Sequence, residues 1–415
     1  MKVYKFGGAS VKDVKGIQNF AKVLKEIKAD KGVVIVSAMG KMTNAFEEIV
    51  NAYYYKKNDL DQKIDFVKSF HQNILEALFS DKKNSVYTEI DQLFFQLVGF
   101  LASNKSKDYN FIYDQIVSQA ELISTKILHS FLKTQNVKST WIDAREYVFT
   151  DANFRQANVD FNKTEKQINK LKKDQLYITQ GFIASTIDNK ITTLGREGSD
   201  YSAAIFAYAL NASSVTIFKD VPGVLNADPK RVGNTVLIEQ MSYKEAVEMA
   251  FYGASVIHPK TIKPLKSKEI PLYVKSFLNP KAKGTTIKNN LELQPKIPCY
   301  IVKEKQHLVS ITTKDFSFIN EKNISEIFSL LSKFQLKANL IQNTAISFSI
   351  CLEDLKGNFD NFLQALKLNY KGKFNSNVKL LTVRHFNQEV IKQIESINKV
   401  LIKQTTRETV QFVVK

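Results

Sequence analysis

Short runs of apolar residues alternate with amphipathic segments through most of the first 290 or so residues. Four of the runs are rich in apolar, often β-branched residues, which favours strands buried in a parallel sheet: 3–6, 33–37, 176–179 and 214–218. Segments with helical spacing follow them, and we expect helices from Ser10 to about Lys28 and from Asp200 to Leu210. This alternation predicts an α/β domain whose mostly parallel sheet is covered by helices on both faces.

The stretch from about residue 44 to residue 135 has a different pattern. It holds a single glycine, Gly99, and no proline, since every proline lies at position 222 or later. Its apolar residues recur at helical spacing, as in Ile116, Ala120, Ile123 and Ile127. We therefore expect several helices inserted into, or packed beside, the α/β unit.

The pattern changes again after Gly284. Residues 288–298 are polar, carry two prolines and lack periodicity, which is typical of a linker. From about Cys299 onward, short strands alternate with short helices and suggest two copies of a strand–helix–strand unit, the second abbreviated. The sequence thus predicts a first domain at 1–289 and a smaller α+β region at 299–415.

Composition limits the classes of protein to which the chain can belong. With 415 residues, 44% of them apolar, it is long enough for two or three folded domains. No apolar run is long enough to span a membrane, and the first residues lack the apolar core of a secretory signal. Two cysteines give no disulfide framework, and five histidines show no metal-binding spacing. We expect a cytoplasmic enzyme with no metal site built from its side chains alone.

The charge of the chain is strongly basic. It carries 59 lysines and arginines against 41 acidic residues, a formal net charge of +18, which could indicate a nucleic-acid partner. The excess consists mostly of single lysines along expected helices, without an arginine-rich run or interleaved aromatic residues. A solvated surface around a site for anionic substrates explains this pattern better, and we expect no nucleic-acid or membrane partner.

Two glycine-containing turns offer anion-binding chemistry. In Lys5–Ser10 (KFGGAS), paired glycines between a strand and a helix would let backbone N–H groups approach phosphate oxygens. Lys5 would add a point charge to a transferring phosphoryl group. In Thr193–Tyr201 (TLGREGSDY), Arg196 could bind a carboxylate through two parallel hydrogen bonds. Taken alone, each motif could also be an ordinary turn.

Further polar segments follow expected strands or helices. Lys219–Val224 leaves a buried strand for a turn, and Asp228 follows in the same loop, where open α/β sheets bind ligands. Gly253–Pro259, which contains His258, is another such turn. Glu121 lies beside an apolar helical face, and a substrate ammonium group would give it a reason to be there. A plain turn or a solvated glutamate would look the same.

Together and in this order, the segments resemble the aspartate kinases of the amino-acid kinase family. Lys5–Ser10 is similar to the family's KFGGTS opening, and residues 37–44 are similar to its second glycine-containing loop. The remaining matches also fall in family order: Glu121, Asp143 with Arg145, 179–182, 193–201, 220–223, 228–229 and 253–259. The resemblance covers about the first 290 residues well, and residues 299–415 more weakly resemble a pair of ACT modules.

The resemblance implies the three-layer α/β/α amino-acid kinase fold, with residues 44–135 as a helical insertion. It implies ATP-dependent phosphorylation of the side-chain carboxylate of aspartate, the first step of lysine, threonine and methionine biosynthesis. ATP and Mg²⁺ are the implied cofactors, and the ACT-like region implies a homodimer. The alternatives are a kinase of another small amino acid and a non-catalytic ligand-binding regulator.

The resemblance also implies roles for single residues. Lys5, Asp200 and Arg196 would carry catalysis without a histidine base, because a carboxylate nucleophile is already ionised near neutral pH. The implied ATP-binding residues are Lys5, Gly7, Gly8, Ser10, Lys219, Asp220, Asp228, Lys230 and Ser255. The implied aspartate-binding residues are Ser37, Thr43, Glu121, Phe182, Arg196, Ser199 and Asp200. Arg196 would bind a carboxylate of aspartate, and Glu121 its ammonium group.

Several residues depart from the family pattern. Four stand where threonine, glycine, tyrosine and lysine respectively are common, which bears on ATP affinity more than on the reaction: Ala9, Glu197, Leu225 and Ser255. In the ACT-like region, Asn339 stands where the family's effector strand has aspartate. Because an ammonium group favours a carboxylate partner, we expect feedback inhibition by lysine to be weak, or to follow a different effector.

Overall fold

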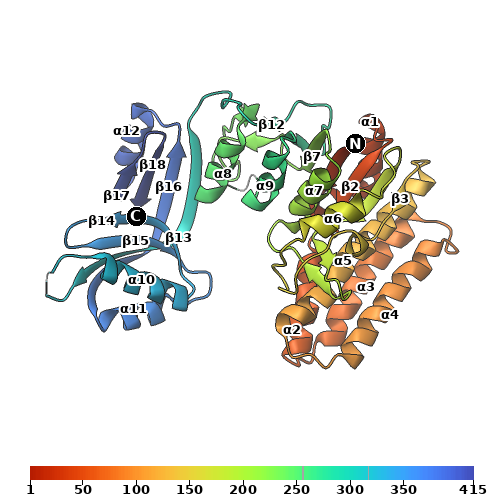
Figure 1. The fold of residues 1–415 in the computed structure, drawn as a ribbon, viewed down its shortest axis with the longest axis horizontal. Coiled ribbons are helices and arrows are strands. Elements are labelled where there is room, and N and C mark those ends of the chain that lie inside the picture. Colours follow the sequence, from red (N-terminus) through yellow and green to blue (C-terminus); the bar gives the residue numbers. More distant parts are fainter. Residues whose placement is uncertain (255–256, 316) are drawn as a thin grey trace. The chain divides into compact units, whose positions relative to one another are not determined.

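The computed structural model describes residues 1–254, 257–315 and 317–415, which form two compact units (Figure 1). The first unit contains Met1–Val224, Leu237–Val247 and the described residues from 257 to Pro295. The second contains Leu225–Val236, residues 248–254 and Lys296–Lys415. The sequence placed the domain boundary between 289 and 299, and the division between the units after Pro295 falls within that linker.

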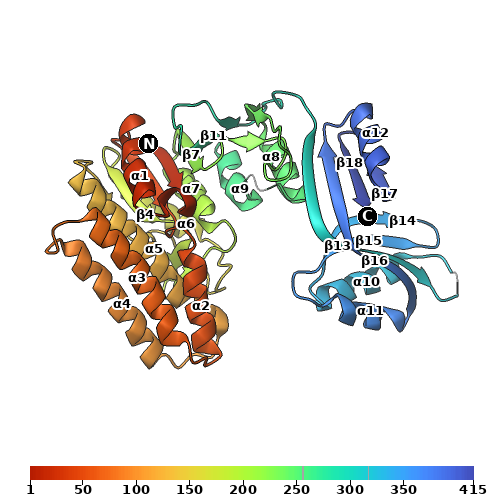
Figure 2. The same cartoon turned by 180° about the vertical axis from the view of Figure 1, so that it is seen from behind.

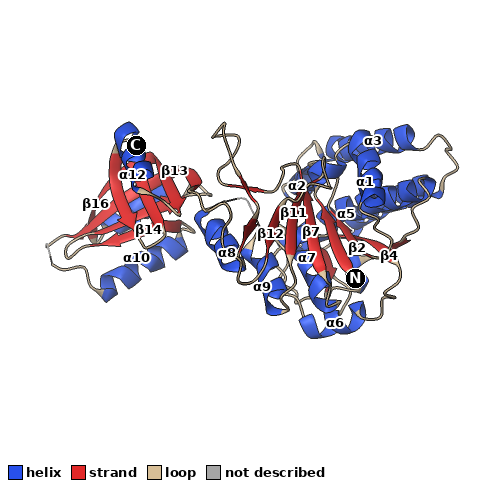
Figure 3. Cartoon of the chain, turned by 90° about the horizontal axis from the view of Figure 1, so that it is seen from above, coloured by secondary structure: helices blue, strands red, loops and turns tan. Residues whose placement is uncertain are grey.

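An eight-stranded sheet forms the centre of the first unit, in the order β10-β12-β11-β7-β1-β2-β4-β3 (Figure 3). Its neighbouring strands are parallel except for β11 and β12. The strands β2, β4 and β7 are buried almost throughout, as their apolar runs predicted. The strands of this sheet are β1 Lys2–Phe6, β2 Gly32–Val36, β3 Thr140–Trp141, β4 Leu176–Gln180, β7 Ser214–Lys219, β10 Gln240–Met241, β11 Leu272–Ser276 and β12 Thr285–Ile287.

Helices cover both faces of this sheet, which makes the unit a three-layer α/β/α structure (Figure 3). Helices α1 and α5 pack on one face, and α6, α7 and α9 on the other. The helices outside the insertion are α1 Val14–Glu26, α6 Phe161–Ile168, α7 Gly198–Ala209, α8 Tyr243–Tyr252 and α9 Pro259–Ser267, with 3-10 turns η1 Gly8–Val11 and η2 Ala144–Glu146. Two small hairpins complete the set: β5 Ile183–Ser185 with β6 Ile191–Thr193, and β8 Val224–Leu225 with β9 Leu237–Ile238.

The glycine-poor stretch forms four helices grouped on one side of the unit (Figure 2). They are α2 Met42–Tyr54, α3 Leu60–Leu78, α4 Ser85–Ser103 and α5 Tyr109–Thr134. Helix α5 packs against both the other three helices and strands β2 and β4, so its apolar residues face protein on more than one side. The four periodic residues predicted for it, Ile116, Ala120, Ile123 and Ile127, are all fully buried.

Two predicted helix starts were wrong. The first helix begins at Val14 and is capped by Asp13, whose carboxylate accepts a hydrogen bond from the Gly16 N–H. Ser10 instead belongs to the preceding 3-10 turn, because the chain makes a tight turn directly after β1. Helix α7 begins at Gly198 rather than Asp200, since the turn at Glu197 already supplies its N-cap.

The second unit is built on a six-stranded antiparallel sheet in the order β14-β15-β13-β16-β18-β17. Helices α10 and α11 bury one apolar cluster against it, and α12 buries another. The elements are β13 Cys299–Thr313, α10 Glu321–Lys333, β14 Lys337–Asn343, β15 Phe348–Glu353, α11 Phe359–Lys367, β16 Tyr370–Arg384, α12 Gln388–Ile397, β17 Val400–Thr405 and β18 Thr409–Val414. The predicted fold class, an α/β/α unit followed by a small α+β region, is confirmed.

Within the described ranges, no helix has the length and apolar character needed to cross a membrane.

Candidate active site

A cleft of about 800 Å³ lies in the first unit, beside the carboxyl ends of β1, β2 and β7. Open parallel sheets bind their ligands at this edge. Most of the residues that the sequence assigned to ATP or aspartate line it: Lys5, Gly7, Gly8, Ser10, Ser37, Thr43, Glu121, Phe182, Arg196, Ser199, Asp200, Lys219 and Asp220. The structure therefore brings together segments that are more than 200 positions apart in the chain.

The loops after β1 and β2 approach each other closely at one wall of the cleft. The N–H of Ser37 donates to the carbonyl of Phe6, and the N–H of Gly40 donates to the carbonyl of Gly8. A Cβ atom on Gly8 would lie 2.7 Å from the carbonyl oxygens of Ala38 and Gly40. The second glycine of the opening motif is thus required for this backbone contact.

The buried side chains of Lys5 and Asp200 form an ion-pair cluster with the partly exposed Lys219 in the cleft. The Lys5 ammonium lies 2.7 Å from Oδ1 of Asp200, and the Lys219 ammonium lies 3.9 Å from Oδ2. Burial alone would raise the pKa of Asp200, but the two lysines together hold it below its usual range. Asp200 is therefore ionised at neutral pH, and this end of the cleft carries two cations around one anion.

The turn before α7 explains the departure at Glu197. Its backbone φ of 52° lies in the left-handed region that favours glycine, the residue that the family pattern leads us to expect at this position. Its carboxylate accepts a hydrogen bond of 2.9 Å from the N–H of His258, directly before α9. His258 itself caps α9 by accepting from the N–H of Lys260. Glu197 thus has a structural partner, and His258 serves as a helix cap.

Arg196 lies in the same turn with its side chain exposed at the cleft. It forms no ion pair with any residue that the structure describes, so its guanidinium can accept an anionic ligand. Gly198, two positions later, packs against the turn at Phe182, where an added Cβ would lie 2.6 Å from the aromatic ring. That contact holds Phe182 at the cleft wall.

Glu121 presents a buried carboxyl group to the cleft from helix α5. It is 2% exposed, and the hydroxyl of Thr43 approaches its Oε1 at 3.4 Å. Its Oε2 has no hydrogen-bond partner in the described part of the chain. Burial raises the pKa of Glu121 to about 8, against the opposing influence of the Ala38 backbone, Lys5 and Thr43. A buried carboxyl group with a free oxygen is a receptor for a donor that a ligand brings.

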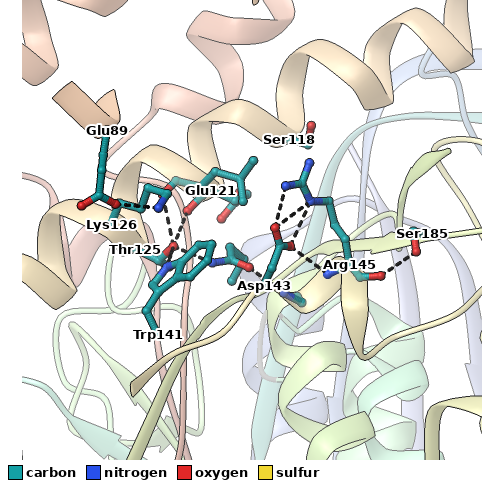
Figure 4. A network of polar contacts seen from close by, with 12 residues as sticks. Glu89, Ser118, Glu121, Thr125, Lys126, Trp141, Asp143, Arg145 and Ser185 are labelled. Atoms are coloured by element: carbon teal, nitrogen blue, oxygen red, sulfur yellow. Dashed lines mark hydrogen bonds and ion pairs between the residues drawn. The ribbon is translucent and has the colours of Figure 1, made fainter. Parts of the chain in front are cut away.

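Hydrogen bonds fix α5 to the sheet beside Glu121 (Figure 4). The hydroxyl of Thr125 accepts from the Trp141 indole at 3.1 Å and from the Gln180 amide at 2.7 Å. The hydroxyl of Ser124 donates to the carbonyl of Ser37 at 2.8 Å. The helix that carries Glu121 is therefore tied both to β4 and to the loop after β2.

Asp143 and Arg145 form a structural pair near this network (Figure 4). Their side chains lie 2.6 Å apart, and Asp143 also accepts from the backbone N–H of Arg145. The hydroxyl of Ser185 donates to the carbonyl of Arg145. Neither side chain is among the residues that line the cleft, and their contacts shape the turn after β3.

Sequence analysis predicted no binding residue at one end of the cleft. There the lining residues include Asn110, Tyr113, Asn153, Phe154, Arg155 and Gln156. The guanidinium of Arg155 stacks 4.1 Å from the Tyr113 ring and lies 3.3 Å from the Glu47 carboxylate. A single arginine in a polar loop has no distinguishing pattern, so only the three-dimensional arrangement reveals it.

Two of the predicted ATP-binding residues, Asp228 and Lys230, are not among the residues that line the cleft. Asp228 and Lys230 belong to the second unit, where the Asp228 carboxylate accepts from the N–H of Lys230. Ser255 lies outside the described residues. Their contact with a nucleotide stays a prediction.

Comparisons with known proteins point to one family. The family profile described as "Amino acid kinase family" matches residues 1–276. The chain is 31% identical to lysine-sensitive aspartokinase 3 of Escherichia coli (strain K12) over 356 residues, 85% of this chain and 78% of that protein. It is 29% identical to the chloroplastic bifunctional aspartokinase/homoserine dehydrogenase 2 of Arabidopsis thaliana, covering 88% of this chain but 42% of that longer protein.

Solved structures agree with the sequence relatives. The structure of E. coli aspartokinase III with lysine and aspartate matches with a TM-score of 0.84 at 27% identity, and covers 100% of this chain and 96% of its own. The structure of the same enzyme with aspartate and ADP matches with a TM-score of 0.82 at 26% identity. The family profile, the sequence relatives and the shared architecture agree. The chain therefore belongs to the amino acid kinase family, among the aspartokinases.

Proposed function

We propose that this cleft transfers the terminal phosphoryl group of ATP to the side-chain carboxylate of aspartate. The observation that carries the proposal is the pairing of two unlike regions in one cleft. A cluster of two lysines around Asp200 lies in the same cleft as the buried, partly unpartnered carboxyl group of Glu121. The first suits phosphate charge, and the second suits the ammonium group of an amino acid.

At the phosphate end, Lys5 and Lys219 would neutralise the charge that develops on the transferring group. Gly7, Gly8 and Ser10 belong to the turn after β1, which lines the cleft, and the backbone N–H groups of this turn can approach phosphate oxygens. Asp200 holds both ammonium groups in place through its ion pairs. Because the attacking carboxylate of aspartate is already ionised, the site needs alignment and charge neutralisation rather than a general base.

At the amino-acid end, Arg196 would bind a carboxylate of aspartate through its fork of N–H donors. Glu121 would receive the ammonium group, and Thr43, Ser37 and Ser199 offer hydroxyl groups nearby. Phe182 closes one wall. An amino acid bound in this way would direct its side-chain carboxylate toward the phosphate end, which is the alignment that phosphoryl transfer requires.

Magnesium fits this cleft as a companion of ATP. In the described part of the chain, no three His, Cys, Asp or Glu side chains are grouped so as to hold a metal ion. Mg²⁺ is commonly held by one or two carboxylates together with substrate phosphates, and the exposed Asp220 at the cleft offers one carboxylate. When bound with ATP, the ion would reduce the negative charge of the phosphates.

We also propose that the second unit supports a homodimer. Strand β14 forms one edge of its sheet, and the nearby apolar side chains Ile341 and Ile346 are exposed. An uncovered edge of this kind is a common place for a second chain to pair. Sedimentation equilibrium at micromolar concentration should give twice the mass of one chain. The expectation of a cytoplasmic location rests on the sequence and stays a prediction.

Two alternatives remain to be separated from this proposal by experiment. A kinase of another small amino acid would use the same phosphate end with a different acceptor, and a non-catalytic regulator would bind ligands without turnover. We propose a coupled assay of ADP formation with aspartate, glutamate or acetylglutamate as acceptor, and with none. Aspartate alone should support rapid turnover. Equal rates with glutamate would favour the first alternative, and no acceptor-dependent rate would favour the second.

A further inference from the structure

Asp114 is a fully buried carboxylate on α5 that no part of the proposed chemistry uses. It lies seven residues before Glu121, which is about two helical turns, so the two side chains leave the same face of the helix. A buried carboxylate without partners is costly in free energy, and its surroundings therefore indicate what it holds.

Three donors from two separate segments meet Asp114. Its Oδ2 accepts from the backbone N–H of Arg155 at 3.0 Å and from the backbone N–H of Thr193 at 3.0 Å. Its Oδ1 accepts from the hydroxyl of Thr193 at 2.7 Å. Burial raises the pKa of Asp114 to about 6, and these hydrogen bonds, first among them that of the Thr193 hydroxyl, oppose the rise. Since burial disfavours the charge, these three donors compensate it directly.

Both tethered segments continue into the lining of the cleft. Arg196, three residues after Thr193, lines the cleft, and so does Arg155 itself. The two segments also touch each other, because the N–H of Ala157 donates to the carbonyl of Thr193. Asp114 therefore joins the helix of Glu121 to the turn of Arg196 and to the loop of Arg155.

The tether also maintains an unfavourable backbone conformation. Arg155 has a φ of 67°, in the left-handed region that few residues other than glycine adopt. Such conformations persist when the surrounding contacts hold them, and they are frequent beside binding sites. The hydrogen bond from the Arg155 N–H to Asp114 is one such contact, and the stacking of its guanidinium on Tyr113 is another.

We propose that Asp114 is a positioning residue that sets the amino-acid end of the cleft, acting through the Thr193–Arg196 turn and the Arg155 loop. This inference rests on the proposed function, because it assigns the amino acid to the end of the cleft lined by Glu121 and Arg196. Asp114 touches no substrate in this account. It fixes the distance between the group that would bind the ammonium and the group that would bind a carboxylate.

The test compares Asp114→Asn with wild type in the coupled assay. The asparagine has nearly the same shape, but its NH₂ group would face N–H and O–H donors. We expect the KM for aspartate to rise by about tenfold or more, with the KM for ATP changed by less than about twofold. A general structural defect would instead lower kcat or raise both KM values together, and that outcome would overturn the proposal. The tether from Gln115 to the carbonyl of Ile191 remains, which favours folding of the variant.

Two further variants keep the proposal falsifiable if Asp114→Asn folds poorly. Thr193→Val removes only the 2.7 Å hydroxyl contact, and Thr193→Ser retains it. We expect the KM for aspartate to rise several-fold in the first and to stay near wild type in the second. Equal values for both variants would contradict the proposal. Asp108→Ala serves as a matched control, because Asp108 caps the same helix by accepting from the N–H of Asn110. It should lower thermal stability while leaving the ratio of the two KM values unchanged.

A readout that does not depend on activity separates this inference from the proposed function. Trypsin cleaves after arginine, and a loosened loop should be cut faster between Arg155 and Gln156. Mass spectrometry of limited digests should show faster cleavage in Asp114→Asn than in Asp108→Ala. Unchanged cleavage together with an unchanged KM for aspartate would reject the inference while leaving the function intact. If wild type lacks aspartate-dependent turnover, the proposed function fails, and faster cleavage alone would then reduce Asp114 to a structural tether and overturn the inference.

Discussion

The first and second units each contain a position that the sequence associates with the ammonium group of an amino acid. In the first unit this is Glu121, a buried carboxyl group whose Oε2 has no hydrogen-bond partner in the described ranges. In the second it is Asn339, on the edge strand β14. Its side-chain oxygen already accepts from the Lys303 ammonium at 2.8 Å, and its NH₂ group donates to Gln306.

The two positions therefore differ in what the protein itself supplies. Around Glu121 the fold leaves a hydrogen-bonding requirement that a ligand can meet. At Asn339 the chain provides its own ammonium group, from Lys303, to a side chain that carries no charge. A polar residue at a family position therefore indicates a ligand only when the neighbouring groups leave part of its hydrogen-bonding capacity unsatisfied.

The largest effect is expected from Lys5→Ala. Lys5 forms the shorter ion pair with Asp200 and also opposes the raised pKa of Glu121, so it links both ends of the cleft. Loss of one electrostatic stabiliser typically lowers kcat by about 10²–10³-fold. We expect that loss in steady-state rates, with the KM for aspartate changed by only a few-fold. A variant that keeps most of its kcat would remove Lys5 from the mechanism.

The next largest effect is expected from Glu121→Gln. The amide keeps the shape of the carboxyl group but cannot carry the charge that an ammonium ligand favours. We expect the KM for aspartate to rise by about tenfold, since a charge-assisted hydrogen bond contributes about 1.5–3 kcal/mol, while the KM for ATP stays within about twofold. An effect confined to the KM for ATP would show that the amino acid binds elsewhere.

A pH dependence should follow from the same group. Because burial raises the pKa of Glu121 to about 8, the carboxyl group is mostly neutral below that pH and ionised above it. An ammonium ligand needs the ionised form, so the KM for aspartate should fall as the pH rises from 6 to 8. The slope should approach about tenfold per pH unit and then level off. Glu121→Gln provides the control, and a slope that survives in this variant would assign the titration to another group.

The smallest effect is expected in the second unit. Because the Lys303 ammonium already donates to the side-chain oxygen of Asn339, added lysine should change the initial rate by less than about twofold at sub-millimolar concentration. Lysine, threonine and both together can be titrated at fixed aspartate and ATP. Strong inhibition by lysine alone would mean that another residue receives its ammonium group, and the contrast between Glu121 and Asn339 would then be lost.

The predictable part of the molecule was the part governed by local pattern. The period of Ile116, Ala120, Ile123 and Ile127 foretold the buried face of α5, and all four are buried. The strands were predictable because buried parallel strands require continuous apolar runs. Motifs next to strand ends also converged in the cleft, because parallel strands bring their carboxyl ends to one edge.

The rest depended on contacts between distant segments. Asp114 and Arg155 lie 41 positions apart and meet through a direct hydrogen bond from the Arg155 N–H to the Asp114 carboxylate, which forms only in the folded chain. The partner of Glu197 is a backbone N–H at His258, which no spacing rule connects to it. The misplaced start of α1 had a local cause, since Ser10 and Asp13 both suit an N-cap and the preceding 3-10 turn decides between them.

Phosphorylation of the side-chain carboxylate of aspartate in the cleft can be tested through its product. An acyl phosphate reacts with hydroxylamine to give a hydroxamate, which can be measured beside ADP from the same reaction. We expect aspartate hydroxamate and ADP to form in equal amounts, to depend on both aspartate and ATP, and to be nearly absent with Lys5→Ala. ADP formation without hydroxamate, or hydroxamate formed equally well from glutamate, would contradict it.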